Sequence, residues 1–383
     1  WYHYSVGTAA DVDNAVATAK NAQAKWSSLT IEERAEILFA AASVMQKATT
    51  ETIAVMSRDA GKTVAEADPE VAEAIDFARF YATTAQNFGE STPLGTILVV
   101  PPWNFPYAIP IGGVCAALAA GNTVVFKPSE YTPTVGKFLA DSFLEATGLN
   151  DVFTCITGLG ETGKYLCESG VNKLAFTGST ATAKRVASTC AQSMTPVVLE
   201  CGGKDPVIVD RDADLKRAAD ATIWSSMSNA GQTCIGAERV YVHQDVADEF
   251  IDHCLRIAST IKPGEPGVGN YGPATMPKQL AIIEGHIKDA IAKGGRVLMG
   301  GVDSVHAPYV DPVIIADVPE DSTAITEETF GPTLVINRVA TMEEAIALAN
   351  ASRYGLGASV WSKRNGKKIA RALTCGMVSI NSV

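Results

Sequence analysis

The sequence predicts an α/β fold made of two doubly wound lobes. Its 383 residues are enough for two or three domains at roughly 150 residues per domain. Short apolar runs alternate with helical stretches, and this alternation starts twice along the chain. Such a rhythm is typical of βα units that feed a buried parallel sheet.

The chain before Pro93 is predicted to be helical. Residues 30–33 read Thr-Ile-Glu-Glu, the pattern of a capping box at a helix start. Apolar residues then recur on one helical face, at Leu38, Ala41, Ala42 and Met45. The pattern of apolar residues changes at Pro93, after which short runs typical of strands begin.

The first series of strands is short and rich in β-branched residues. We expect strands at 96–100, 123–126, 152–156, 173–176 and 196–199. Between two of them, Thr132 is the expected N-cap of a helix that continues with Pro133 and ends at Gly148.

A second series begins at the strand 206–209. Helices are expected near 213–228, 245–260, 277–293 and 341–351, and a strand at 239–242. We therefore place a first domain at 1–201 and a second at 202–383. In doubly wound sheets ligands bind beyond the carboxyl ends of the strands, so we expect the functional residues of both lobes there.

Composition excludes several classes of partner. Lysine and arginine number 31 and aspartate and glutamate 42, which gives a net charge of −11. Nucleic acids and anionic membranes are disfavoured partners for such a chain. The longest apolar stretches fall short of the roughly 20 residues of a spanning helix, and a reducing, cytoplasmic location is expected.

The eight cysteines show neither a paired spacing nor a zinc pattern. A disulfide framework or a metal site is therefore not indicated. The sequence starts at Trp1 rather than methionine and stops at Val383 soon after a strand-like stretch, so we expect both ends to be trimmed. A targeting peptide of the original protein would then lie outside this sequence.

Polar residues follow each predicted strand of the first lobe. After the first strand, prolines bracket Trp103 and Asn104, which fits either a held amide or an ordinary turn. After the second, Lys127, Ser129 and Glu130 fit a ribose site or a solvated ion pair.

Two glycine-containing turns compete for a phosphate. Residues 158–163 match G-x-G-x-x-G from Gly158, but no acidic residue stands at a clear strand end about 20 residues later. Gly178 and Ser179 precede a helix from about Ala181, which fits either a phosphate cradle or a simple helix cap.

Glu200 ends the fifth predicted strand and precedes Gly202 and Gly203. A carboxylate at the end of an apolar strand is costly to desolvate, which would raise its pKa toward that of a general base. The two glycines would let water or substrate approach closely. A glutamate turned to solvent is the competing interpretation.

One thiol stands in an unusual place. Cys234 ends Gly-Gln-Thr-Cys, between a predicted helix and the strand at 239–242. A free cysteine is more often buried among apolar residues. Further on, residues 327–332 place Glu328 and Phe330 on a predicted turn.

Six motifs in this order resemble the aldehyde dehydrogenase superfamily. They read Pro-Trp-Asn-Phe-Pro, Lys-Pro-Ser-Glu, Phe-Thr-Gly-Ser-Thr, Leu-Glu-x-Gly-Gly-Lys, Gly-Gln-x-Cys and Glu-Glu-x-Phe-Gly-Pro. The resemblance runs from the N-terminal helices to Asn381, and it implies a Rossmann-like cofactor domain followed by an α/β catalytic domain. It points to an NAD(P)-dependent, non-phosphorylating enzyme of the semialdehyde dehydrogenase kind.

The resemblance implies a mechanism through a thiohemiacetal and a thioester. Cys234 would be the nucleophile, the Asn104 amide and the Cys234 N–H would hold the oxyanion, and Glu200 would activate water. CoA-acylating members, which do not need a base at Glu200, are the first alternative. A catalytically silent binding or structural protein of this fold is the second.

The cofactor residues carry over in the same way. Lys127 and Glu130 would bind the adenosine ribose, Ser179 the pyrophosphate and Glu328 the nicotinamide ribose, with Phe330 beside the ring. The expected cofactor contacts also include Trp103, Ser129, Gly158 and Gly178. A carboxylate at Glu130 favours NAD over NADP, because it repels a 2′-phosphate.

Some positions depart from the family pattern. Ala183 stands where many members have glycine, and Gly112 and Gly113 stand where a succinate-type anchor would be. Between Glu90 and Pro93 the chain is shorter than in typical members, so the small oligomerisation element is expected to be absent or incomplete. A homo-oligomer, dimer or tetramer, is the expected assembly of the full-length form. The apolar residues Tyr107, Trp224 and Met227 are expected to line the aldehyde pocket.

Overall fold

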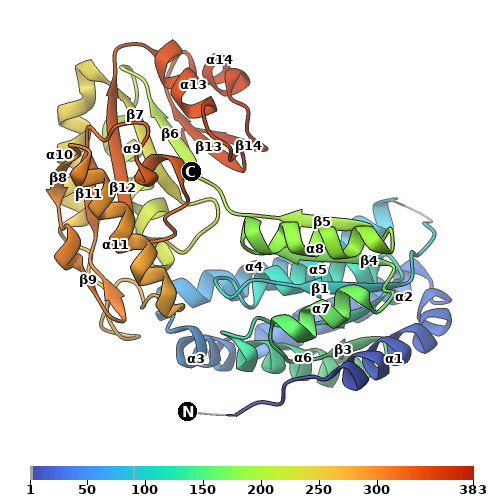
Figure 1. Cartoon of the computed structure of the whole chain (residues 1–383). Coiled ribbons are helices and arrows are strands. Elements are labelled where there is room, and N and C mark those ends of the chain that lie inside the picture. The colour runs from blue at the N-terminus through green and yellow to red at the C-terminus, as the bar shows by residue number, and fades with distance from the viewer. Residues whose placement is uncertain (1–2, 89–90) are drawn as a thin grey trace. The chain divides into compact units, whose positions relative to one another are not determined.

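The computed structural model describes residues 3–88 and 91–383. The expected shortening at Glu90 therefore lies partly outside the described residues. The chain splits into two compact units, Trp1–Cys201 (unit 1) and Gly202–Val383 (unit 2). Each unit holds an α/β sheet, as the sequence predicted (Figure 1).

Unit 1 begins with helices whose caps were readable in the sequence. The Thr30 hydroxyl accepts from the Glu33 backbone and the Glu33 carboxylate accepts from the Thr30 backbone, which closes the predicted capping box. The helices are α1 (Ala9–Ser27), α2 (Ile31–Lys47), α3 (Thr49–Ala60) and α4 (Val64–Phe88).

A five-stranded, all-parallel sheet forms the centre of unit 1, in the order β3-β2-β1-β4-β5. Its strands are β1 (Thr96–Val100), β2 (Thr123–Phe126), β3 (Phe153–Cys155), β4 (Lys173–Thr177) and β5 (Val197–Glu200). The intervening helices are α5 (Ala108–Ala119), α6 (Pro133–Thr147), α7 (Gly160–Glu168) and α8 (Thr180–Gln192). All five predicted strands are confirmed within a residue or two.

Helices cover both faces of this sheet (Figure 1). Leu98, Val125 and Leu174 pack with residues of α1, α7 and α8 in one core. Val99 and Val124 lie in the other core, with residues of α2, α4, α5 and α6. Helix α6 ends at the left-handed Gly148 as predicted, but the Thr132 side chain makes no capping hydrogen bond.

Unit 2 contains a seven-stranded sheet in the order β14-β13-β6-β7-β12-β11-β8. All paired neighbours are parallel except β8 and β11. The strands are β6 (Asp205–Val209), β7 (Ala237–His243), β8 (Arg296–Met299), β11 (Val313–Ala316), β12 (Thr333–Val339), β13 (Gly357–Trp361) and β14 (Met377–Ile380). A separate two-stranded ribbon pairs β9 (Val305–His306) with β10 (Tyr309–Val310).

The predicted helices of unit 2 are all present. They are α9 (Leu215–Met227), α10 (Ala247–Ala258), α11 (Pro277–Ala292) and α13 (Met342–Asn350), with α12 (Thr323–Thr326) and α14 (Gly366–Ala372) in addition. Short 3₁₀ turns are η1 (Ser228–Gly231), η2 (Gln244–Val246) and η3 (Val302–Ser304). Residues of α9 and α10 share a core with one face of the sheet, and α11, α13 and α14 supply the cores of the other.

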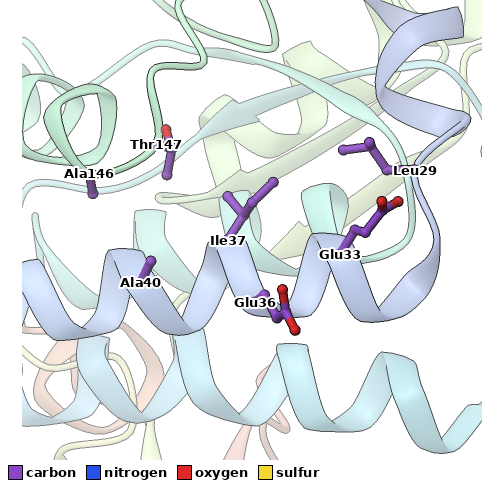
Figure 2. A pocket seen from close by; sticks show the side chains of 7 residues that line it. All are labelled: Leu29, Glu33, Glu36, Ile37, Ala40, Ala146 and Thr147. Carbon is purple, nitrogen blue, oxygen red and sulfur yellow. The ribbon is translucent and has the colours of Figure 1, made fainter.

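A shallow hollow of about 420 Å³ lies on unit 1 between α2 and α6. Figure 2 shows Ile37 of α2 pointing toward the α6 side of the hollow. None of the candidate functional residues lines it. Among the described residues, no helix is both long and apolar enough to cross a membrane.

Candidate active site

The candidate residues of unit 1 gather at one edge of its sheet. Because neighbouring strands are parallel, their carboxyl ends share an edge, and adjacent ends lie about 5 Å apart. In sheet order the edge carries Gly158, then Lys127, Ser129 and Glu130, then Trp103 and Asn104, then Gly178 and Ser179, and last Glu200. The candidates of unit 1 therefore lie at the carboxyl ends of its strands.

The loop between β1 and α5 holds Asn104 away from solvent. The side chain is only 5% exposed, although its loop consists of prolines, aromatics and turns. Asn104 therefore lies in an ordered, buried corner directly after a strand, rather than on an exposed turn.

Lys127 is buried, so the interpretation of Lys127 and Glu130 as a solvated ion pair is wrong. It is 4% exposed, and its ammonium donates to the carbonyl of Pro128 at 3.0 Å. Burial lowers the pKa of Lys127, and the charge of Glu130 opposes this shift. Glu130 itself is exposed at the end of the turn, so the surface charge at this point is negative.

The two glycine-containing turns differ in structure: one packs against the N-terminal segment and the other caps a helix. A side chain at Gly158 would overlap Thr162, whose hydroxyl donates to the Gly7 carbonyl at 2.7 Å. This glycine is therefore required by packing against the N-terminal segment. Ser179 is the N-cap of α8, its hydroxyl accepting from the Thr182 N–H, and the exposed helix start leaves donors for an anion.

Glu200 departs from the sequence expectation. It is exposed on the edge strand β5, so the predicted desolvation is wrong. It lines a cavity of about 540 Å³ in unit 1, together with Val198, Ala175 and Gly113. Glu200, Val198 and Ala175 share one face of the sheet, because Val198 pairs with Ala175 and Glu200 with Thr177. The alternation of exposed and half-buried residues along β5 explains the error: Glu200 belongs to the open face.

In unit 2 the candidates lie at the opposite kind of edge. Gly202 and Gly203 precede β6, Cys234 precedes β7, and Glu328 and Phe330 precede β12. These strands are parallel neighbours in the order β6-β7-β12. The candidates of unit 2 therefore precede their strands, in contrast to those of unit 1, which follow theirs.

The loop that carries Cys234 is fixed by its own side chains. After α9 three successive residues, Asn229, Ala230 and Gly231, adopt left-handed conformations. The Gln232 amide donates to the carbonyls of Asn229 and Pro273, at 2.9 and 3.2 Å, and its oxygen accepts from the Thr275 N–H at 2.9 Å. These hydrogen bonds hold the turn between α9 and β7, in which Cys234 is half-buried.

Burial and acidic neighbours set the chemistry of this corner. The pKa of Cys234 is raised to about 11, chiefly by burial and further by Asp205 and Glu328. Burial likewise raises the pKa of Glu328 to about 8 and that of Asp205 to about 7. The sequence predicted a thiolate nucleophile, whereas the unliganded thiol is largely protonated at neutral pH.

Gly202 and Gly203 lie against two other loops of unit 2. A side chain at Gly202 would overlap the Glu328 carboxylate, and one at Gly203 would come within 2.7 Å of the Cys234 carbonyl. The absence of side chains at these glycines therefore makes room for Glu328 and for the backbone of the Cys234 loop. At Gly202 the Glu328 carboxylate lies directly against the backbone of the loop that precedes β6.

The expected apolar lining is also wrong for most of its residues. Tyr107 and Met227 are buried in the cores of their units. Trp224 is 66% exposed on α9. Apolar character alone did not separate core positions from ligand-lining ones.

Sequence reasoning missed a set of buried charges next to the candidates. Lys204, Asp205 and Glu238 are all buried. The available signal was a charge inside or directly before an apolar strand, as in residues 204–209 and 237–243, because such charges are rarely buried unless they are paired. Within the described ranges, no cluster of His, Cys, Asp or Glu could hold a metal ion.

Comparisons with known proteins agree with this architecture. The family model "Aldehyde dehydrogenase family" matches residues 1–383. A D-glyceraldehyde dehydrogenase (NADP(+)) of Picrophilus torridus is 32% identical over 383 residues, covering 94% of this chain and 78% of the relative. The corresponding enzyme of Thermoplasma acidophilum is 33% identical with the same coverage. The crystal structure of lactaldehyde dehydrogenase from Escherichia coli matches with a TM-score of 0.93 and 32% identity, over 99% of this chain and 84% of that one.

The fold and the ordered motifs thus define an oxidoreductase of the α/β type. The chain belongs to the aldehyde dehydrogenase family, the NAD(P)-dependent enzymes that oxidise aldehydes to carboxylic acids.

Proposed function

We propose that Cys234 is the nucleophile of this aldehyde dehydrogenase. The observation that carries this proposal is its place at the amino end of β7, half-buried on a loop pinned by Gln232 and beside the carboxyl of Glu328. A strand end braced by side chains fixes a nucleophile in position, which lowers the cost of orienting it.

In the first step the Cys234 thiol gives its proton to a water molecule, the sulfur bonds to the carbonyl carbon of the aldehyde, and the electron pair of the C=O π bond moves to the oxygen. The carbonyl oxygen becomes an oxyanion, for which the Asn104 amide and the Cys234 N–H are the proposed donors. Removing one such donor typically lowers kcat by about 10²–10³. Asn104→Ala is expected to show this loss, and an unchanged kcat would refute the assignment.

When bound, NAD(P)⁺ supplies the hydride acceptor and a positive charge that favours a nearby thiolate. Loss of hydride from the tetrahedral carbon leaves a thioester on Cys234. Glu200 then takes a proton from water, whose oxygen attacks the thioester carbon, and the acid leaves as the sulfur is released. The exposure of Glu200 suits a base that must meet water.

The residues present suit a dinucleotide. Among the described residues, the buried Oε1 atom of Glu328 finds no hydrogen-bond partner, so a ribose hydroxyl can satisfy it. The N-terminus of the 13-residue helix α8, capped by Ser179, suits a pyrophosphate. Phe330, next to Glu328, would lie beside the nicotinamide. Lys127, Ser129 and Glu130, with Trp103, Gly158 and Gly178 on the same edge, are the proposed adenosine-half contacts.

We propose NAD⁺ as the preferred cofactor. The exposed carboxylate of Glu130 accepts from a 2′-hydroxyl and repels a 2′-phosphate, while the buried Lys127 ammonium is turned to Pro128. The two archaeal relatives carry NADP(+) in their names. Initial rates at varied cofactor concentration give the KM for NAD⁺ and for NADP⁺. Tighter binding of NADP⁺ than of NAD⁺ would overturn the proposal. Glu130→Ala is expected to narrow the preference for NAD⁺ over NADP⁺.

The proposed substrates are short hydroxyaldehydes. Similar enzymes are named for D-glyceraldehyde and lactaldehyde. A panel of glyceraldehyde, lactaldehyde and unsubstituted alkanals, each assayed for NAD(P)H formation with and without CoA, tests this class. A strict requirement for CoA would favour the acylating alternative, and no turnover of any aldehyde would favour a silent protein.

We further propose a homo-oligomer that works in the reducing cytoplasm. No disulfide joins any of the eight cysteines, all of which lie within the described residues. The strand β14 lies at an edge of the unit 2 sheet and exposes Met377 and Ile380, and such edges invite pairing with another chain. Sedimentation equilibrium measures the state, and a monomer at assay concentration would contradict the proposal.

A further inference from the structure

The loop that carries Glu328 and Phe330 is held in a conformation that it would not adopt alone. Phe330 has a φ of 54°, in the left-handed region that a bulky residue rarely occupies. Such a conformation persists only when the surroundings over-determine it. The contacts of this loop within unit 2 show what does so.

Glu238 supplies the main restraint from the neighbouring strand. Its carboxylate oxygens accept from the Thr329 N–H at 2.8 and 3.1 Å, and Oε1 also accepts from the Phe330 N–H at 3.0 Å. Glu238 lies near the start of β7, next to β12 in the sheet. Hydrogen bonds to a carboxylate are stronger than neutral ones, so this side chain ties down two consecutive backbone amides.

Lys204 neutralises Glu238 in the interior. Its ammonium pairs with the Glu238 carboxylate and donates to the Thr329 hydroxyl at 3.1 Å. The lysine is 1% exposed and the glutamate 5%. Arg239 fixes the lysine backbone in turn, because its guanidinium donates to the Lys204 carbonyl at 2.8 Å.

Helix α11 completes the restraint from the other side of Thr329. The Gln279 amide donates to the Thr329 carbonyl at 2.6 Å, and the His286 ring nitrogen lies 3.1 Å from the Thr329 hydroxyl. Every polar atom of Thr329 is thus engaged. The residues on either side of it, Glu328 and Phe330, are the ones proposed to meet the cofactor.

We propose that Glu238, charge-balanced by Lys204, is a positioning residue for the nicotinamide half of the cofactor. It acts through the backbone of Thr329 and Phe330, which sets the direction of the Phe330 ring and the Glu328 carboxylate. This inference rests on the proposed role of Glu328 and Phe330 as contacts of the nicotinamide riboside.

Unit 1 offers a matched control. There Lys62 and Glu70 form a second buried ion pair, with 2.6 Å between Nζ and Oε2. The Glu70 carboxylate accepts from the N–H groups of Tyr107 and Ala108, at 2.7 and 3.2 Å, where α5 begins after the Asn104 loop. The same substitution can therefore be made in two buried pairs that hold two different loops.

The experiment compares Glu238→Gln with Glu70→Gln in the otherwise unchanged chain. Dissociation constants are measured for NADH and for ADP-ribose, which lacks the nicotinamide. We expect Glu238→Gln to weaken NADH binding about tenfold and to leave ADP-ribose binding within about twofold. We expect Glu70→Gln to lower kcat and to leave both dissociation constants within about twofold.

Three results would overturn the inference. They are normal NADH binding by Glu238→Gln, an equal loss of NADH and ADP-ribose binding, and the same NADH loss in Glu70→Gln. If Glu238→Gln does not fold, the double variant Lys204→Met, Glu238→Gln removes both buried charges at similar volume. The glutamine that replaces Glu238 in this double variant keeps one acceptor oxygen in place of two for the N–H groups of Thr329 and Phe330. The double variant must therefore also bind NADH more weakly than the original chain.

Phe330→Ala separates this inference from the proposed function. Weakened NADH binding in Phe330→Ala, with normal binding in Glu238→Gln, refutes the positioning role alone. Normal NADH binding in Phe330→Ala refutes the proposed contact of Phe330 and the inference that rests on it.

Discussion

The two units present their candidate residues at opposite ends of their strands. In unit 1 the residues follow β1 to β5 and lead into helices such as α8, whose N-terminus favours an anion. In unit 2 they precede β6, β7 and β12 and come after helix ends and left-handed turns. The unit 1 edge therefore supplies backbone donors at the start of α8 beside the exposed carboxylates Glu130 and Glu200, whereas the unit 2 edge supplies a buried carboxyl group and a thiol.

This difference explains the electrostatics of the two edges. Burial raises the pKa of Cys234 to about 11, and the nearby acids Asp205 and Glu328 raise it further. Burial, and after it the charge of Glu238, likewise raises the pKa of Glu328 to about 8. An edge of this kind suits a cationic ring, whereas the unit 1 edge suits a phosphate. Changes at the two edges should thus have separable effects.

The largest expected effect is at the thiol. Cys234→Ser should lower the rate of aldehyde oxidation by about 10⁴-fold or more, because a hydroxyl is a far weaker nucleophile. The measurement is NAD(P)H formation under saturating substrate. Cys375→Ser, which changes another half-buried thiol of unit 2, is the control and should retain turnover. Equal rates for Cys234→Ser and the original chain would refute the proposal that the nucleophile is the Cys234 thiol of unit 2.

The next effect concerns the unit 1 edge. Glu200→Gln should slow steady-state turnover by about 10²–10⁴-fold, because hydrolysis of the thioester loses its base. The pre-steady-state burst of NAD(P)H should persist, and mass spectrometry should detect the acyl group on Cys234. A variant that loses the burst together with the turnover would place Glu200 before hydride transfer.

The thiol should also react slowly with alkylating agents. With a pKa of about 11, against about 8.5 for an ordinary cysteine, the thiolate fraction at neutral pH is lower by roughly 10²-fold. The rate of Cys234 alkylation, followed by peptide mass spectrometry, should rise with pH until about pH 11. Glu328→Gln should shift this midpoint downward, since it removes one of the negative charges that raise it. A midpoint near that of free cysteine would contradict the burial of this corner.

The smallest effect is on cofactor affinity. The Glu328 carboxyl has a pKa of about 8 in the free chain, and a cationic, hydroxyl-bearing ligand prefers its ionised form. Binding of NAD⁺ should therefore strengthen as pH rises, by up to about tenfold per unit below pH 8, and level off above it. Titration calorimetry at several pH values measures this, and Glu328→Gln should flatten the profile. Affinity that falls as pH rises would show that Glu328 binds as the neutral acid.

Local signals in the sequence predicted most of the fold. The capping box at Thr30, the left-handed stop at Gly148 and the β-branched runs at 96–100 and 123–126 act within a few residues, so they could be recognised without a partner. Errors began where distant residues decide. Thr132 reads as a cap but its side chain makes no capping bond, and Tyr107 and Met227 read as pocket lining but lie in the cores.

By itself the sequence determined the five strands of unit 1, the main helices of unit 2 and the order of the six motifs, because spacing and residue type specify local structure and family. It did not predict the strands β8, β11, β12 and β13 of unit 2. Only the tertiary structure decided that unit 2 uses the amino ends of its strands and that Glu200 lies on an open face. It also decided that Lys204, Glu238 and Thr329 meet. Burial and charge neighbours, which set the pKa of Cys234 and Glu328, come from segments far apart in the chain, and no local pattern reports them.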